Sequence, residues 1–442
     1  MLAALLPVAL SAPLCSTPDA IAALSGAALP SDPRMLAAPP DLRIGVHSGA
    51  PPPPDAKPIY GTPYEGHAVS DNFLVTWAEG TMDEEHVSRT LEDLEDGWHA
   101  LVEEQGWPMP VSSDTWKLWV VLDPSLAGTG FTTTYSTPEY PDGYPVIYLN
   151  PSYAPDVRFW RSLTQHELAH ALQYRLRSYT PDPGEPWYWE ASAQWQAELA
   201  DPDNDGHLYT AAWYAERPGD RFDSMIDSHQ YGMFVLNAFL EEQITGPDGL
   251  RQVWLLAAER PGTPWDEILA ESTDSTPAEL WAGFSSAYGN RQLVESPGYA
   301  IAFEQGTLGE GVGGAVAYLG SDYWSVPVSG DVSLLTDAPE AAILGAPGET
   351  GACVSVSAGD VLTVSGLTDS GAVSYTLTLE HRCDGSEDSG IGNGTETGDD
   401  GSADGRSGKE TAGGCSAAPL PGALGLVALP LLVGRRRQDR GV

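Results

Sequence analysis

Three residues that could together bind a metal and move a proton lie within five positions of one another: His166, Glu167 and His170. No proline or glycine interrupts residues 161–178, and leucines and alanines recur along one side, so this segment is predicted to be a helix. Residues four apart lie one turn above each other, which puts both histidines on one face. Two imidazoles so placed can fill two corners of a tetrahedral Zn²⁺ site, with Glu167 placed to take a proton from a water at the metal.

The pattern has a second interpretation, in which His166 and His170 are half-buried histidines of an amphipathic helix. A third ligand would decide between the two. Residues 186–198 form a second predicted helix, which begins with a proline suited to a first turn and follows a loop rich in Pro and Gly. Its Glu190 lies 20 positions after His170 and is expected to point toward the first helix.

His-Glu-x-x-His followed at this distance by Glu-Ala-x-Ala-x-Trp, which begins at Glu190, resembles the gluzincin zinc metallopeptidases over residues 60–300. The resemblance implies that His166, His170 and Glu190 bind zinc and that water fills the fourth position. It also implies a downstream donor of a hydrogen bond to the oxyanion. Tyr231 is the candidate and His229 the reserve, while a tyrosine buried at a helix start for packing is the alternative.

The same resemblance implies a sheet edge along which a peptide substrate lies extended. Residues 145–150, a predicted strand just ahead of the first helix, are expected to form this edge, and residues 128–135 could overhang the cleft. The related metzincin pattern requires Gly and His where Gln173 and Leu176 stand, so it does not fit.

Composition limits the partners of the chain. Its 442 residues are enough for two or three domains, and its 42% hydrophobic content is normal for a globular protein. The formal net charge of −41 makes nucleic acid and anionic membrane surfaces poor partners. None of the four cysteines lies near the histidines, but Cys353 and Cys383 bracket a strand-rich segment and could form a disulfide, which would suit export.

Both ends of the chain differ in composition from its middle. Residues 1–16 resemble the apolar part of a signal peptide, and residues 17–58 read as a Pro/Ala-rich linker or propeptide. Residues 384–413 form a predicted disordered acidic linker. Residues 414–442 combine a cysteine, an apolar run and an arginine cluster, which resembles a myxobacterial C-terminal sorting tail that engages sorting machinery or the membrane. A plain tail anchor is the alternative.

Between these ends the chain divides into two predicted regions. Residues 59–298 read as an α+β zincin-like domain with a mixed sheet, an active-site helix and a helical C-terminal half. Residues 299–383 read as a small all-β sandwich of accessory role, because short β-rich runs alternate there with Gly, Ser and Asp. The predicted elements of the first region are strands 72–77, 116–122 and 145–150 and helices 83–105, 231–243, 250–260, 265–272 and 277–288.

An acidic turn follows the Glu190 helix. Asp201, Asp203 and Asp205 alternate ahead of Gly206, a pattern that can converge oxygen ligands on Ca²⁺. Ala212 stands where an EF-hand would need its twelfth-position carboxylate, so an EF-hand is excluded. Calcium binding and a simple polar turn both stay open.

These patterns predict an exported zinc metallopeptidase, secreted or held at the cell surface, that hydrolyses a peptide or protein substrate. An endopeptidase is favoured because no Gly-x-Met-Glu-Asn stretch is present to read a free amino terminus. The first alternative is a surface-anchored binding protein with an inactive zincin domain. The second is an accessory or adhesin role without any metal.

Overall fold

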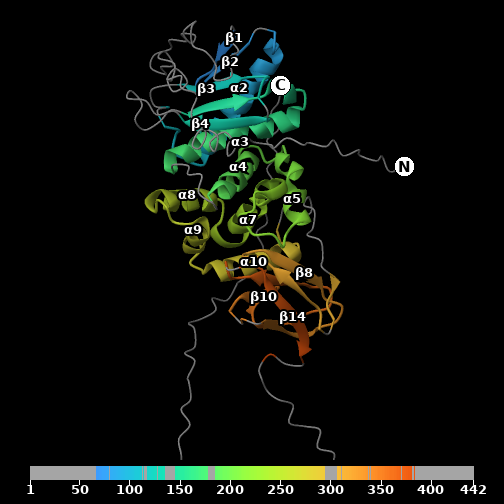
Figure 1. Ribbon diagram of the computed structural model, residues 1–442. Helices are drawn as coiled ribbons and strands as arrows, with labels where there is room; N and C mark the ends of the chain where they lie inside the picture. The colour runs from blue at the N-terminus through green and yellow to red at the C-terminus, as the bar shows by residue number, and fades with distance from the viewer. Residues whose placement is uncertain are drawn as a thin grey trace, which may run out of the picture. The chain divides into compact units, whose positions relative to one another are not determined.

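The computed structural model describes residues 66–383 (Figure 1). Positions 79, 112, 114–116, 127, 135–144, 178–184, 294–305, 310, 337, 339, 370 and 381–382 fall outside this description. The predictions for residues 1–16, 17–58, 384–413 and 414–442 therefore lie outside the described residues. None of the described helices is both long and apolar enough to cross a lipid bilayer.

A five-stranded mixed sheet begins the fold, with strand order β1-β2-β3-β5-β4. Its strands are β1 (Gly66–Val69), β2 (Phe73–Trp77), β3 (Leu118–Leu122), β4 (Gly130–Thr134) and β5 (Pro145–Leu149). The three central strands β2, β3 and β5 run parallel, while β1 and β4 are antiparallel to their neighbours. β3 and β5 are buried at every residue, which fits their near-continuous apolar sequences.

The order of these strands corrects one expectation. Strand β5, which corresponds to predicted strand 145–150, is internal because it pairs with both β3 and β4. The sheet ends at β4 instead, inside the segment expected only to overhang a cleft. The reason is that β4 precedes β5 in the chain but folds back antiparallel to it on the outer side.

Two long helices pack against this sheet (Figure 1). They are α2 (Glu84–Trp98), which continues into the π-helical segment η3 (His99–Glu104), and α3 (Val157–Leu176), which follows the short η4 (Pro151–Tyr153). Val87, Leu94 and Trp98 of α2 and Trp160 and Leu168 of α3 share one core with the sheet strands. The predicted amphipathic helix over 83–105 is therefore confirmed.

The next part of the chain is helical and surrounds a core rich in aromatic side chains. Its α-helices are α4 (Pro186–Ala200), α5 (Ala211–Glu216), α6 (His229–Gly232), α7 (Phe234–Phe239), α8 (Gly249–Glu259), α9 (Trp265–Ser272) and α10 (Pro277–Gly289). Three short segments join them: η5 (Gly206–Tyr209), η6 (Ile226–Ser228) and the π-helical η7 (Leu240–Thr245). The single helix predicted over 231–243 is thus divided into α6, α7 and η7, whereas α8, α9 and α10 match their predictions closely.

The last described part is β-rich, as predicted. One sheet has the order β11-β10-β13-β8-β6 and the other β12-β9-β14-β7, and both contribute to one apolar core. The strands are β6 (Gly306–Thr307), β7 (Gly313–Val316), β8 (Ser321–Ser325), β9 (Gly330–Thr336), β10 (Ala342–Ala346), β11 (Glu349–Gly351), β12 (Cys353–Val356), β13 (Val361–Gly366) and β14 (Val373–Glu380). The expected disulfide between Cys353 and Cys383 is present. The observed fold is an α+β domain followed by β-sheets.

The β-rich part is not isolated from the helices. Leu319 and Tyr323 belong to the aromatic core of the helical part, and the hydroxyls of Tyr214 and Tyr323 lie 3.0 Å apart. The hydroxyl of Ser321 lies 3.2 Å from the indole nitrogen of Trp281 on α10. Buried polar groups of both parts therefore satisfy one another.

Candidate metal centre

Helix α3 carries both histidines. The carboxylate of Asp156 caps its first turn by accepting from the amide of Phe159, and no glycine or proline interrupts it. Every residue from Ser162 to Gln173 is buried, because the sheet and α2 cover part of the helix and α4 covers another part. This burial explains why His166 and His170 lie inside the protein rather than on an exposed face.

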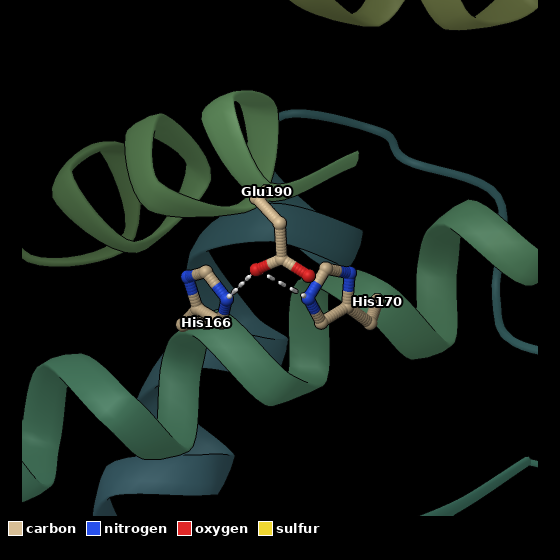
Figure 2. Close-up of side chains that lie close together, drawn as sticks. All are labelled: His166, His170 and Glu190. Atoms are coloured by element: carbon tan, nitrogen blue, oxygen red, sulfur yellow. Dashed lines mark hydrogen bonds and ion pairs between the residues drawn. The ribbon is translucent and has the colours of Figure 1, made fainter. Parts of the chain in front are cut away.

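Glu190 on α4 points at both imidazoles, as Figure 2 shows. Its Oε2 lies 3.2 Å from Nε2 of His166 and 3.6 Å from Nε2 of His170. Two ligands bound about 2.1 Å from zinc in a tetrahedron are separated by about 3.4 Å, so both distances suit a shared metal. Among the described residues, the His, Cys, Asp and Glu side chains that could hold an ion together are His166, His170 and Glu190. Their ligand atoms lie within 4.8 Å of one another.

The charges at this centre are strongly coupled. Burial alone would raise the pKa of Glu190, but the imidazoles of His170 and His166 outweigh it and hold that pKa at about 2. Burial would lower the pKa of His170, yet the carboxylates of Glu190 and Glu167 outweigh this effect and raise it. A buried site this rich in negative charge is suited to a cation.

Two buried atoms of the centre have no hydrogen-bond partner among the described residues: Oε1 of Glu190 and Nδ1 of His166. A buried carboxylate oxygen left unpaired is costly. A bound cation would satisfy Glu190, so the residues present fit a metal ion. Two imidazoles and one carboxylate are one of the donor sets found in catalytic zinc sites.

Glu167 lies beside the triad and is fully buried. The hydroxyl of Thr132 on β4 lies 2.8 Å from its Oε2, and a Cβ added to Gly130 would come within 3.0 Å of its Oε1. Residues of strand β4 therefore contact both oxygens of the Glu167 carboxylate or leave room for them. Neither Thr132 nor Gly130 was identified from the sequence, because only the fold brings β4 to α3.

A small cavity borders His166. Its volume is about 10 Å³, which is room for roughly one water molecule. Its walls come from α3, α4 and the segment that follows, with Phe159, Ser162, Leu163, Gln194, Gly206 and Thr210 as lining residues.

The two candidate oxyanion donors occupy different positions. The ring centroid of Tyr231 lies 6.1 Å from that of His166, and Tyr231 is fully buried. His229 packs instead against Tyr214, at 5.6 Å between ring centroids, and neither of its ring nitrogens has a hydrogen-bond partner in the described structure. The structure thus brings Tyr231 near the triad and places His229 in a separate aromatic environment.

Of the two alternatives left open for Asp201–Asp205, calcium binding or a polar turn, the structure favours the polar turn. The carboxylate of Asp201 binds the guanidinium of Arg161, and that of Asp205 lies 3.3 Å from Arg158. Both arginines come from α3, about one turn apart, and they neutralise the carboxylates that a cation would need. The acidic turn is therefore a polar helix-terminating turn tied to α3.

Comparison with known proteins identifies one related family. Residues 61–272 match the family described as a family of unknown function (DUF6055), a range that contains the sheet, α3, α4 and the whole triad. None of the curated proteins compared with this chain is significantly similar to it. The matched family carries no assigned activity, so functional inference rests on the site itself.

Proposed function

We propose that the chain is an exported zinc-dependent metallopeptidase with a gluzincin-like catalytic domain. The observation that carries this proposal is the convergence of His166, His170 and Glu190 beside Glu167. The ligand set and the neighbouring carboxylate are those required for hydrolysis by an activated water. The contact between the edge strand β4 and Glu167, the proposed general base, supports a zincin-like fold.

The roles of the side chains follow from their positions. His166, His170 and Glu190 would hold Zn²⁺, which when bound supplies Lewis acidity to the scissile carbonyl. Glu167 accepts a proton from the attacking water and then delivers it to the leaving amine. Tyr231 donates a hydrogen bond to the carbonyl oxygen as negative charge develops on it, and His229 is the reserve donor.

Strand β4 is the proposed binding site of an extended peptide. It ends the sheet and its Thr132 contacts Glu167, so a peptide paired along it would pass the general base. Pairing of this kind binds the peptide backbone and depends little on its side chains. An endopeptidase is proposed because the sequence has no Gly-x-Met-Glu-Asn stretch.

Export is supported by the disulfide between Cys353 and Cys383, since such bonds persist in oxidising compartments. We propose a secreted or cell-surface location on this basis, with residues 414–442 as the sorting or anchoring segment.

One observation keeps the first alternative open. His170, Glu167 and Glu190 are all 0% exposed, and such burial also suits a metal that only stabilises the fold. A binding protein with an inactive zincin domain would bind zinc without needing Glu167.

The test is zinc content and casein cleavage of the full chain, with and without a chelator. We expect one zinc per chain and chelator-sensitive cleavage, loss of zinc in Glu190→Gln, and retained zinc but no cleavage in Glu167→Gln. Glu198→Gln changes another buried carboxylate on α4 and serves as the matched control, which should keep its zinc. Zinc binding without any cleavage would support the inactive-domain alternative, and absence of zinc would refute both.

A further inference from the structure

The side chain of Gln173 joins the metal-binding face of α3 to α4. It is fully buried, one turn after His170, and its Oε1 lies 2.8 Å from Nδ1 of that imidazole. Its Nε2 lies 3.2 Å from the backbone oxygen of Trp189, 3.0 Å from the hydroxyl of Ser192 and 3.0 Å from Oε1 of Gln196. One amide group thus contacts a proposed metal ligand and three positions of the neighbouring helix.

The partners on α4 determine which way the amide points. The backbone oxygen of Trp189 can only accept, so the nitrogen of Gln173 must face it. The hydroxyl of Ser192 donates to the backbone oxygen of Tyr188 at 2.5 Å and is free to accept from the same nitrogen. The oxygen of Gln173 therefore faces His170.

This orientation fixes the tautomer of His170. An amide oxygen only accepts, so Nδ1 of the imidazole must carry a proton. In the neutral ring the lone pair then lies on Nε2, the nitrogen 3.6 Å from Oε2 of Glu190. Gln173 thus holds His170 in the form that a metal at the triad requires.

The same amide group acts on the second helix. Trp189 immediately precedes Glu190, so the bond to its backbone oxygen restrains the turn that carries the carboxylate ligand. His166 receives no comparable support, since its Nδ1 has no hydrogen-bond partner among the described side chains and backbone groups.

We propose that Gln173 is a positioning residue that preorganises His170 and Glu190 for metal binding. It touches neither the metal position nor a substrate and acts through His170. The proposal rests on the metal centre put forward above, but it concerns metal affinity and not peptide hydrolysis.

The first test is the zinc dissociation constant of the full chain, measured by competition with a chelating dye. Gln173→Leu removes both the acceptor for His170 and the donor to α4. We expect zinc to bind about 10- to 100-fold more weakly, as when other hydrogen-bond partners of metal-bound histidines are removed. Gln173→Glu keeps an acceptor for His170, and Gln196 has an unpaired Nε2 that can turn toward the new carboxylate. Because this variant loses the donor to the backbone oxygen of Trp189, we expect a zinc affinity between those of wild type and Gln173→Leu.

The control is Ser192→Ala, which removes a partner of Gln173 on α4 without touching His170. Urea midpoints of the four metal-free proteins show whether affinity merely follows stability. A purely structural role predicts that Gln173→Leu and Gln173→Glu lose affinity in proportion to their loss of stability, and that result would overturn the proposal. Zinc binding by wild type with an unchanged constant in Gln173→Leu would also overturn it while leaving the proposed function intact.

The second test needs no variant that could misfold. In ¹⁵N NMR spectra of the zinc-loaded wild-type chain, we expect a slowly exchanging proton on Nδ1 of His170. A His170 ring bound through Nδ1, with its proton on Nε2, would contradict the proposed role of Gln173.

Discussion

The hydroxyl of Thr132 lies 2.8 Å from the side-chain Oε2 of Glu167 and 2.8 Å from the backbone oxygen of the same residue. An edge strand is thereby joined to the proposed general base by a fully buried contact. A carboxylate on a flexible side chain loses catalytic efficiency when its orientation is not restrained, because proton transfer requires hydrogen-bond geometry.

Replacing Thr132 should therefore impair catalysis without removing the metal. Thr132→Val keeps the shape of the side chain but cannot donate, and we expect kcat to fall about tenfold or more with KM and zinc content nearly unchanged. Thr132→Ser restores the donor and should recover most of kcat. Equal kcat values for the valine variant and wild type would show that the hydroxyl does not orient Glu167.

Tyr231 and His229 can be separated by their different surroundings. If Tyr231 stabilises the oxyanion, Tyr231→Phe should lower kcat by about 10²- to 10³-fold while zinc stays bound. His229→Gln should lower kcat far less, since His229 packs against Tyr214. Steady-state kinetics on one peptide substrate measures both, and the reverse ranking would exchange their roles.

His229 should make stability depend on pH. Burial, followed by the charge of Arg217, lowers the pKa of His229 to about 4, and the carboxylate of Asp223 offsets this only in part. The unfolded chain, with an ordinary pKa near 6.5, takes up the proton first as pH falls, so the folded state loses stability below about pH 6.5.

The difference is measurable with a variant that cannot titrate. We compare the free energy of unfolding of metal-free His229→Leu with that of metal-free wild type at each pH. The difference, variant minus wild type, should be about 2 kcal/mol larger at pH 5 than at pH 7.5. Urea unfolding of both metal-free proteins at the two pH values gives this difference. A value that does not change with pH would mean that His229 is charged or solvated in the fold.

The contact between Tyr214 and Tyr323 predicts that the β-rich part supports the helical part. Tyr323→Phe leaves the buried hydroxyl of Tyr214 without this partner and should cost about 1–2 kcal/mol of unfolding free energy. Tyr153→Phe removes a hydroxyl from a half-buried tyrosine elsewhere and should cost less. Similar losses in the two variants would argue that the parts are independent.

The candidate metal centre could be predicted from the sequence because its signals are local. Helical periodicity puts His166 and His170 on one face, and the motif containing Glu190 follows on the next helix. The division of the chain into an α+β part and a β-rich part also follows from composition and from the alternation of short β-rich runs with Gly, Ser and Asp.

Other features depend on which elements the fold brings together. The edge position of β4 is decided by strand order, which no local pattern contains. Arg158 and Arg161 precede the acidic turn by about 40 residues, so no local sequence pattern indicates that they pair with Asp205 and Asp201. Gln173 could have been noticed, since it lies one turn after His170, but its bonds to α4 could not.

The disulfide also changes how the last sheet can come apart. Strands at a chain end usually fray first, because only hydrogen bonds hold them. Here Cys383, just past β14, is bonded to Cys353 on β12, and both β12 and β14 pair with β9. The disulfide closes a loop with a sequence separation of 30. The lost conformational entropy of the unfolded chain corresponds to about 3.5 kcal/mol of stabilisation of the folded state. Pulling on the chain or cleaving it beyond residue 383 would therefore not separate β14 from the sheet at its C-terminal end, because the disulfide links β14 to β12 and both strands pair with β9.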